Sequence, residues 1–208
     1  FEGVGESLAN SVLVGGATLV LSLLIGAPAG YGLARYVFRG HDAFQLLILA
    51  TRAFPIVILA VPLAVAFIDW GLYDSIVAVA LVHTALALPT TILTTGSIFV
   101  AVPRDVEEAA LTLGCTPFGS LVRVVLPLAL PGLAAASLFT FLLSWNEVFA
   151  AVMLTLSHRT LPALVLGALS VSPLPFRFAG GFALVVPSLV FVFFIRRYLF
   201  NLWGRVGR

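Results

Sequence analysis

Lysine is absent from this 208-residue sequence, and all eleven basic residues are arginine. Charged residues of both signs make up only 10% of the chain, whereas soluble domains carry about 25%. Hydrophobic residues reach 61%, which is more apolar surface than a soluble core could cover. These totals predict a polytopic membrane protein. The small net charge of +2 gives no indication of nucleic-acid binding.

The residues that several kinds of active site require are also missing. Cys115 is the single cysteine, which excludes an internal disulfide and a cysteine-based metal site. The sequence has no cluster of metal ligands, no nucleophile beside a base, and no phosphate-binding loop of the form G-x-x-x-x-G-K-[ST]. We therefore predict that this chain is not an enzyme, binds no metal or cofactor itself and does not hydrolyse ATP.

Long apolar runs predict an all-α fold in a single transmembrane domain, residues 1–208. A helix needs about 20 apolar residues to cross a bilayer core. Five runs of this length lie at residues 11–33, 43–68, 75–100, 131–155 and 179–200. Small residues in the first run, among them Gly26 and Gly30, favour close packing of helices in lipid. Pro55 and Pro62 interrupt the second run.

The arginine distribution predicts the orientation, because cytoplasmic loops of membrane proteins carry an excess of basic residues. One side of the predicted bundle holds Arg35, Arg39, Arg104, Arg123, Arg196, Arg197, Arg205 and Arg208, and the other holds only Arg159 and Arg177. Residues 103–127 and the C-terminus are therefore expected in the cytoplasm, and residues 157–178 outside. Residues 1–10 are then also outside, which predicts one further helix before them and six spans in total.

The segment 103–127 is the sizeable polar interruption between the apolar runs, and its residues predict two short helices. Asp105 is expected to cap the first helix together with Glu108. Gly114 can adopt the left-handed conformation that ends a helix. Thr116 and Pro117 are typical of the start of another, which we expect to end before Pro127. On these residues alone, the segment is either an ordinary capped loop or a docking element for a soluble partner.

The same segment resembles a known signature. Glu108-Ala109-Ala110, three residues, Gly114, nine residues and Val124-Val125-Leu126-Pro127 are similar to the motif of bacterial ABC importer permeases, which reads EAA, three residues, G, nine residues, I-x-L-P. Val124 in place of isoleucine is the one departure. The resemblance implies a type I ABC importer transmembrane domain whose coupling helix docks into an ATPase subunit. The coupling residues it implies are Glu107, Glu108, Ala109, Ala110, Gly114, Leu126 and Pro127.

Further short motifs resemble the carbohydrate branch of these permeases, of the maltose-transporter G-subunit type. They are Asn10-Ser11, Tyr31-Gly32-Leu33-Ala34-Arg35, Phe38-Arg39-Gly40, Ser144-Trp145-Asn146-Glu147 and Thr160-Leu161-Pro162. The resemblance implies a second permease subunit, an ATPase dimer that carries ATP and magnesium, and a sugar-binding protein that contacts residues 157–178. It also implies that the tail, Arg205 to Arg208, can reach the ATPase. We expect a disaccharide such as trehalose or maltose as the solute.

Polar residues within the apolar runs are candidates for the solute path. A charged side chain in the bilayer is costly and should face the bundle interior or a water-filled cavity. The candidates are Trp145, Asn146, Glu147, Arg52 and His83. Trp145 could stack on a sugar while its polar neighbours bind hydroxyl groups. Alternatively, Asn146 and Glu147 hydrogen-bond helices together or pair with Arg52. Arg52 could instead extend its charged end to the membrane surface. His83 could make a structural hydrogen bond. Asp69 and Asp74 are expected to be solvated loop residues.

Three other functions remain compatible with the residues. A proton-coupled secondary carrier would use Glu147, His83 and Arg52 as a relay. An ABC permease could serve a solute other than a sugar. A membrane scaffold without transport activity would not need the charges within its spans.

Overall fold

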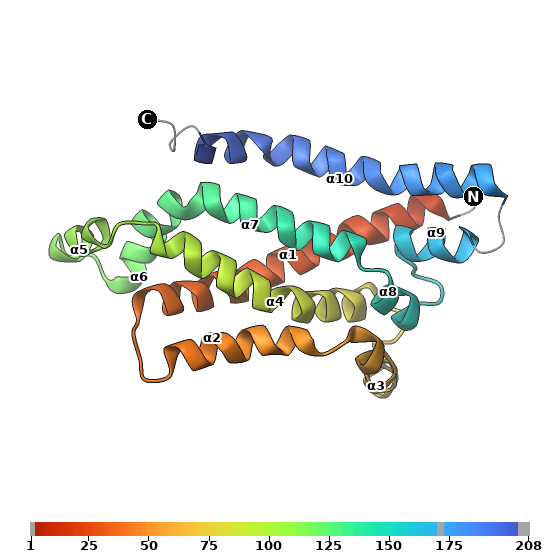
Figure 1. Ribbon diagram of the computed structural model, residues 1–208, viewed down its shortest axis with the longest axis horizontal. Helices are drawn as coiled ribbons and strands as arrows, with labels where there is room; N and C mark the ends of the chain where they lie inside the picture. The colour runs from red at the N-terminus through yellow and green to blue at the C-terminus, as the bar shows by residue number, and fades with distance from the viewer. Residues whose placement is uncertain (1–2, 170–172, 204–208) are drawn as a thin grey trace.

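Four long helices dominate the computed structural model, which describes residues 3–169 and 173–203. They are α1 (Val4–Arg35), α4 (Ile76–Val100), α7 (Leu126–Asn146) and α10 (Leu174–Trp203). They extend along the length of the molecule, with α2 along one side (Figure 1). No strand occurs in the described ranges. Helices α1, α4, the continuous run 117–146 and α10 are each long and apolar enough to cross a membrane.

The second predicted span, 43–68, is not one straight helix. Helix α2 (His41–Ala50) and the 3-10 turn η1 (Thr51–Ala53) end before Pro55, and α3 (Ile56–Asp69) then leaves at an angle of 82°. Phe54 is extended because the proline ring disfavours helical geometry in the preceding residue. Counting this bent pair as one span gives five spans, as the sequence predicts.

The fourth predicted span, 131–155, is displaced toward the N-terminus of the chain. The helix begins at α6 (Pro117–Ser120), passes through the π-helical turn η2 (Leu121–Val125) and continues as α7 to Asn146. Our expectation that a helix ends before Pro127 is therefore wrong. The amide of Leu126 bonds to the carbonyl of Leu121, and Pro127 has no amide to satisfy, so the helix continues through it. Helix α8 (Phe149–Leu154) is separate.

The remaining boundaries differ less. Helix α4 agrees with the predicted run 75–100, whereas α1 begins seven residues before the predicted start at residue 11. The prolines in the segment 157–178 predict an irregular course with a short helix at residues 163–169, and α9 (Leu161–Leu169) matches that helix. However, α10 already begins at Leu174, so part of the segment expected to be irregular is helical.

Helices α1 and α4 approach closely at glycines, as their small residues predict. A Cβ atom on Gly26 would lie 2.8 Å from Cγ2 of Thr91. A Cβ atom on Gly30 would collide with Oγ1 of Thr95 and lie 2.6 Å from the amide nitrogen of Gly96. The hydroxyl of Thr95 donates to the carbonyl of Gly26 at 3.0 Å. Small residues thus let the two backbones meet, which is the usual device for helix pairs in lipid.

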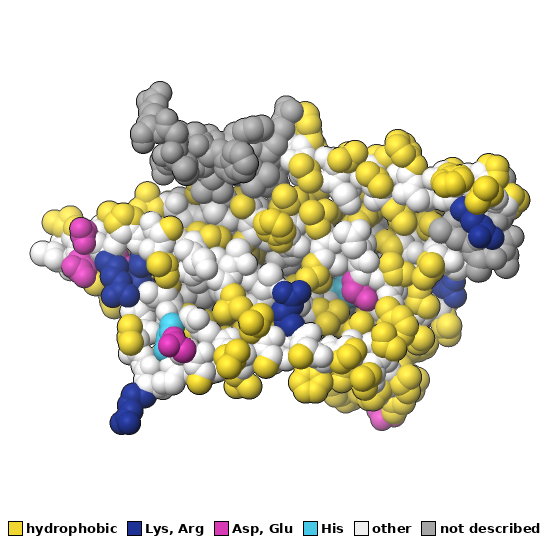
Figure 2. Space-filling model, viewed as in Figure 1, with side chains coloured by type: hydrophobic (Ala, Val, Ile, Leu, Met, Phe, Trp, Pro, Cys, Tyr) yellow, Lys and Arg dark blue, Asp and Glu magenta, His cyan; other side chains and the backbone are white. Residues whose placement is uncertain are grey.

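Hydrophobic side chains cover much of the long middle of the molecule, and charged ones gather at the end formed by α5 (Figure 2). Exposed large apolar residues lie on α2, α3 and α10, including Leu46, Ile58 and Phe182. Such broad apolar surfaces are expected where lipid or another membrane subunit covers a helix.

Candidate functional site

The first candidate site is the short helix α5 (Arg104–Thr112), which protrudes with α6 at one end of the molecule (Figure 1). Helix α5 begins two residues earlier than expected, with Pro103 in place of Asp105 at the capping position and no side-chain cap. The predicted cap by Asp105 with Glu108 is therefore wrong, because Asp105 already lies within the first turn. Its carboxylate and that of Glu107 still favour the positive end of the helix dipole.

The turn after α5 has the predicted geometry. Gly114 has a φ of 90°, in the left-handed region that glycine adopts without a Cβ penalty. The amide of Cys115 donates to the carbonyl of Ala110 at 3.0 Å, as in a Schellman motif. The hydroxyl of Thr116 accepts the amide of Gly119 at 3.1 Å and caps α6. This turn folds the chain back toward the bundle.

Helix α5 has two different faces. Glu108 and Ala109 are exposed, and Leu113 at the C-terminal end of the helix is 87% exposed. Glu107 and Ala110 are buried against the bundle. The exposed face is thus available to a partner, while the other face belongs to the protein interior. Sequence reasoning placed Glu107 with the docking residues, and the structure separates it from them.

Both carboxylate oxygens of Glu107 are bound by the last turn of α1. The hydroxyl of Tyr31 donates to Oε1. Nε of Arg35 donates to Oε2 at 2.7 Å, and both side chains of this ion pair are largely buried. Nη2 of Arg35 also donates to the carbonyl of Val102, at 3.1 Å. A buried charge needs such partners, since it would otherwise be strongly destabilising.

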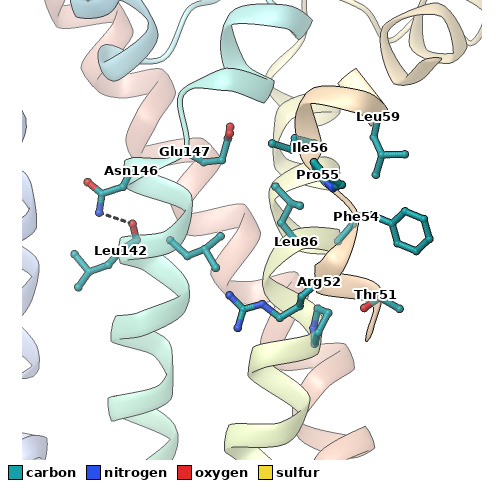
Figure 3. Close-up of a pocket in the computed structure, with 13 residues that line it drawn as sticks. Thr51, Arg52, Phe54, Pro55, Ile56, Leu59, Leu86, Leu142, Asn146 and Glu147 are labelled. Carbon is teal, nitrogen blue, oxygen red and sulfur yellow. Dashed lines mark hydrogen bonds between the residues drawn. The ribbon is translucent and has the colours of Figure 1, made fainter. Parts of the chain in front are cut away.

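The second candidate site is a cavity of about 900 Å³ between the bend at η1, α4 and the end of α7. Figure 3 shows Arg52 extending from η1 into the space beside α4, while Phe54 points away. Arg52, Asn146 and Glu147 are the polar lining groups with amide or charged ends, and Ile56, Leu86 and Leu142 are among the apolar ones. A mostly apolar pocket with a few polar groups is typical of a small-molecule site.

Glu147 lies at the end of α7 and not in the middle of a span, which corrects our expectation. Its carboxylate accepts the amides of Phe149 at 3.1 Å and Ala150 at 2.9 Å and so caps α8. Its Oε2 lies 3.1 Å from Nε2 of His83, whose Nδ1 lies 2.8 Å from the hydroxyl of Ser144. Because a carboxylate only accepts, Nε2 of His83 is the donor in its contact with Glu147. This arrangement agrees with the structural hydrogen bond expected for His83.

The structure separates three residues that were predicted to border the solute path together, namely Trp145, Asn146 and Arg52. Trp145 is 2% exposed, and its Nε1 donates to the carbonyl of Leu184 on α10 at 3.0 Å. It therefore does not line the cavity, so its predicted role in stacking on a sugar is wrong. Asn146 donates to Leu142 in its own helix at 2.8 Å. Arg52 makes no ion pair with Glu147, and within the described ranges its guanidinium group makes no hydrogen bond.

The opposite end of the molecule contains organising residues that the sequence analysis missed or left without a role. Oδ1 of Asp74 accepts the amides of Leu156, Ser157 and His158 at 2.7, 2.9 and 3.2 Å. Burial would raise the pKa of Asp74, but these amides lower it to about 2. The expectation of a solvated loop residue is wrong for Asp74. No pattern in the sequence indicates this role, because the left-handed φ of 57° at Asp74 is known only from the structure.

The motif Asn10-Ser11 has a related position. Asn10 donates to the carbonyl of Arg159 at 3.1 Å, and the hydroxyl of Ser11 accepts the amide of Leu161 at 2.7 Å. Asp74, Asn10 and Ser11 thus fasten the α8–α9 connection and the start of α9 to the rest of the bundle. The predicted contact of Arg205 to Arg208 with a partner falls outside the described residues.

The pattern of one protein family, described as "Binding-protein-dependent transport system inner membrane component", matches residues 22–205. The chain belongs to this family. It is therefore a multi-pass permease of the bacterial inner-membrane type and a transport component, not an enzyme. The five apolar spans agree with this assignment.

Several curated proteins are similar to this permease. A putative ABC transporter permease protein, ORF1 of Streptomyces antibioticus, is 35% identical over 94% of this chain and 87% of its own length. The trehalose transport system permease protein SugB of Mycobacterium tuberculosis is 32% identical over 92% of this chain and 72% of its own. The diacetylchitobiose uptake system permease protein NgcG of Streptomyces coelicolor is 37% identical over 73% of this chain. The matched part corresponds to 50% of the length of that relative.

Solved transporters share the fold. A chain of the MetNI methionine ABC transporter matches with a TM-score of 0.74 and 22% identity, covering 94% of this permease and 92% of that chain. A chain of an importer of the polysaccharide alginate matches with a TM-score of 0.69 and 24% identity, covering 97% and 75%. The permease therefore has the fold of a type I ABC importer transmembrane domain.

Proposed function

We propose that this permease forms half of the translocation path of an ATP-driven sugar importer and that α5 is its coupling helix. One observation carries the proposal: the permease signature folds into a protruding helix whose exposed face includes Glu108 and Ala109. An ATPase dimer binds this end, and its closure on ATP and magnesium moves α5. A second permease subunit completes the path. ATP and magnesium are held by the ATPase subunits.

The proposed orientation follows from the arginines. Arg35, Arg104 and Arg123 lie near the α5 end of their helices, and Arg159 precedes α9 at the other end. Helix α10 also runs toward the α5 end, so its last described residue, Trp203, lies on the same side of the bundle (Figure 1). Since basic residues concentrate on the cytoplasmic side, α5 faces the cytoplasm. The α8–α9 connection then faces the binding protein outside.

The coupling residues have distinct proposed roles. Glu108 pairs with a basic residue of the ATPase, and Ala109 leaves room for a cleft. Ala110 packs against the bundle, and Gly114 forms the turn that shapes the docking surface. Leu126 and Pro127 lie where the returning helix begins its straight course as α7 and carry the movement into the bundle.

A sugar is the proposed solute class. The similar permeases are named for trehalose, diacetylchitobiose and sulfoquinovosyl glycerol, which all contain a sugar unit. The cavity supports this class because Arg52, Asn146 and Glu147 can bind hydroxyl groups while apolar neighbours face the carbon skeleton. A disaccharide such as trehalose or maltose is the solute we propose. A solute of another class remains the alternative, and the solute bound by the partner binding protein distinguishes them.

The decisive experiment is Glu108→Lys in the complete transporter, reconstituted in vesicles with its binding protein. We expect uptake and the stimulation of ATP hydrolysis by loaded binding protein to fall at least ten-fold, because a lysine would repel the basic partner. Asp42→Asn is the control, since this carboxylate is fully exposed in the first turn of α2, outside the permease signature. Unchanged uptake and stimulation in Glu108→Lys would refute the role of α5.

The paired His83 and Glu147 give one observation in favour of a proton-coupled carrier. The family assignment supports the ATP-driven mechanism instead. The two differ in a simple measurement on vesicles. A protonophore leaves uptake unchanged in an ATP-driven importer and abolishes it in a proton-coupled carrier, whereas omission of the ATPase subunits has the opposite effect.

A further inference from the structure

The structure assigns Glu107, Arg35 and Tyr31 as the joint through which movement of α5 reaches α1, a role separate from docking. This inference rests on the proposed function of α5 as the coupling helix. Glu107 and Glu108 are neighbours in sequence but lie on different faces of α5: Glu107 is buried and Glu108 is exposed. Successive residues of a helix are about 100° apart, so one turn carries two carboxylates with different partners.

Polar contacts in both directions join the last turn of α1 to α5 and to the connection that precedes α5. Tyr31 and Arg35 each bind one oxygen of Glu107. Arg35 also donates to Val102, and Nη2 of Arg104 donates back to the carbonyl of Ala34 at 3.2 Å. The last turn of α1 therefore holds both the first turn of α5 and the connection that precedes it.

The covalent link between α4 and α5 is not a rigid rod. Helix α4 ends at Val100, and Pro103 is extended, with a φ of −57° and a ψ of 134°. Proline also has no amide, so the helical hydrogen bonds are interrupted between the two helices. A force on α5 would bend this connection unless other contacts resisted. The ion pair with Arg35 supplies that resistance from a neighbouring helix.

The surroundings make this joint stiff. The ring of Tyr31 packs edge-on against Phe99 with centroids 5.5 Å apart, within an apolar cluster that also contains Val102, Val125 and Leu133. The guanidinium carbon of Arg35 lies 6.0 Å from the centre of the Tyr31 ring. Charges in such surroundings are held in place because separation would leave each without a partner.

From α1 the movement has a direct route to the cavity. Gly30 lets the backbones of α1 and α4 meet so closely that the two helices must shift together. Ala85, Leu86 and Pro89 of α4 line the cavity wall. Glu107 therefore acts as a positioning residue: it does not touch the solute, but it fixes how α5 displaces the wall of the solute path.

The test is Glu107→Gln in the complete reconstituted transporter, compared with Glu108→Gln and with Asp42→Asn as the unaffected control. Uptake, ATP hydrolysis and the amount of ATPase that co-purifies are measured together. We expect Glu107→Gln to retain its ATPase but to hydrolyse at least five-fold more ATP per solute transported. Tyr31→Phe, which keeps the ion pair, is expected to show a smaller increase in the same ratio. Glu108→Gln is expected to lose co-purifying ATPase.

An unchanged ratio of ATP hydrolysed to solute transported in Glu107→Gln contradicts the proposed joint. A loss of co-purifying ATPase equal to that in Glu108→Gln also contradicts it, because Glu107 would then be a docking residue. If Glu108→Gln leaves co-purification and uptake unchanged, the proposed function of α5 fails instead. The two failures are therefore distinguishable.

A distance measurement keeps the inference testable if Glu107→Gln folds poorly. Nitroxide labels at Val37, two residues beyond the end of α1, and at Thr112, the last residue of α5, are introduced in a Cys115→Ser background. They report the separation of the two helix ends in the assembled transporter. We expect the same distance without nucleotide and with ATP, and a nucleotide-dependent change when Tyr31→Phe or Glu107→Gln is added. A change in the protein without these substitutions, or none in either variant, contradicts the joint.

Discussion

Nε2 of the fully buried His83 lies 3.1 Å from Oε2 of Glu147, across the interface between α4 and the end of α7. The same carboxylate caps α8. One side chain therefore closes the break after α7, satisfies a buried imidazole and forms part of the cavity wall. The arrangement explains why a carboxylate is found in an apolar segment of a membrane protein.

Glu147→Ala is expected to destabilise the permease by about 2–4 kcal/mol. The substitution leaves Nε2 of His83 buried without a partner and removes the cap of α8, and each loss costs about 1–2 kcal/mol. Thermal unfolding in detergent is the measurement. Glu147→Gln keeps an acceptor oxygen and should lose less than half as much. Equal losses in the two variants would show that the hydrogen bonds of Glu147 do not stabilise the fold.

Gly30→Ala is expected to destabilise the pairing of α1 with α4. The added Cβ would lie 2.6 Å from the amide nitrogen of Gly96, and the backbones would have to separate. Overpacking of this kind costs about 1–3 kcal/mol. Gly32→Ala, on the same helix, meets no atom within 4 Å and should be neutral or slightly stabilising. A similar unfolding temperature for both variants would contradict the close contact.

Asp74→Asn is expected to loosen the connection between α8 and α9. Asparagine tolerates the left-handed backbone of Asp74, but its neutral oxygen accepts the three amides more weakly. Amide exchange of Leu156, Ser157 and His158 at pH 7 should be faster in this variant. Asp69→Asn is the control, because Asp69 is exposed.

The effect of Asp74 should also depend on pH. Its pKa is lowered from 3.8 to about 2 in the folded chain, so its stabilising contribution is complete above about pH 4 and is lost as the pH falls toward 2. The difference in exchange between Asp74→Asn and the unmodified permease should disappear over this range. A difference that is as large at pH 2 as at pH 7 would mean that the charge of Asp74 is not its cause.

Arg52→Gln and Trp145→Phe should have opposite profiles. Arg52 lines the cavity, so its loss is expected to slow uptake about ten-fold, which corresponds to one charge-assisted hydrogen bond of about 1.4 kcal/mol. Trp145 is buried against α10, so Trp145→Phe should lower stability by about 1 kcal/mol and leave the solute preference unchanged. Uptake assays with several sugars and thermal unfolding separate the two. A changed preference in Trp145→Phe would return this residue to the path.

Features that depend on neighbouring residues were predictable. The turn at Gly114, the cap at Thr116 and the short helix α9 appear where the sequence placed them, because local backbone preferences decide them. The bend at Pro55 also follows from a local restriction. The helix end predicted at Pro127 was wrong. The missing amide of a proline need not break a helix when a local change of hydrogen-bond pattern, here the π-helical turn η2, accommodates it.

The partners of buried polar residues were not predictable. Periodicity gave no reason to separate Glu107 from Glu108 or Trp145 from Asn146, because it does not say which side of a helix another helix covers. The carboxylate of Glu147 pairs with His83 and not with Arg52, and the carboxylate of Asp74 accepts three amides more than eighty residues away in sequence.

The sequence alone determined the class of this protein, the number of its spans and its permease signature, because these depend on composition, length and spacing along the chain. Only the tertiary structure decided that Glu107 faces α1 while Glu108 faces outward, and that Glu147 rather than Trp145 borders the cavity. The physical reason is that a side chain's role is set by the groups that surround it, and packing brings those groups from distant parts of the chain.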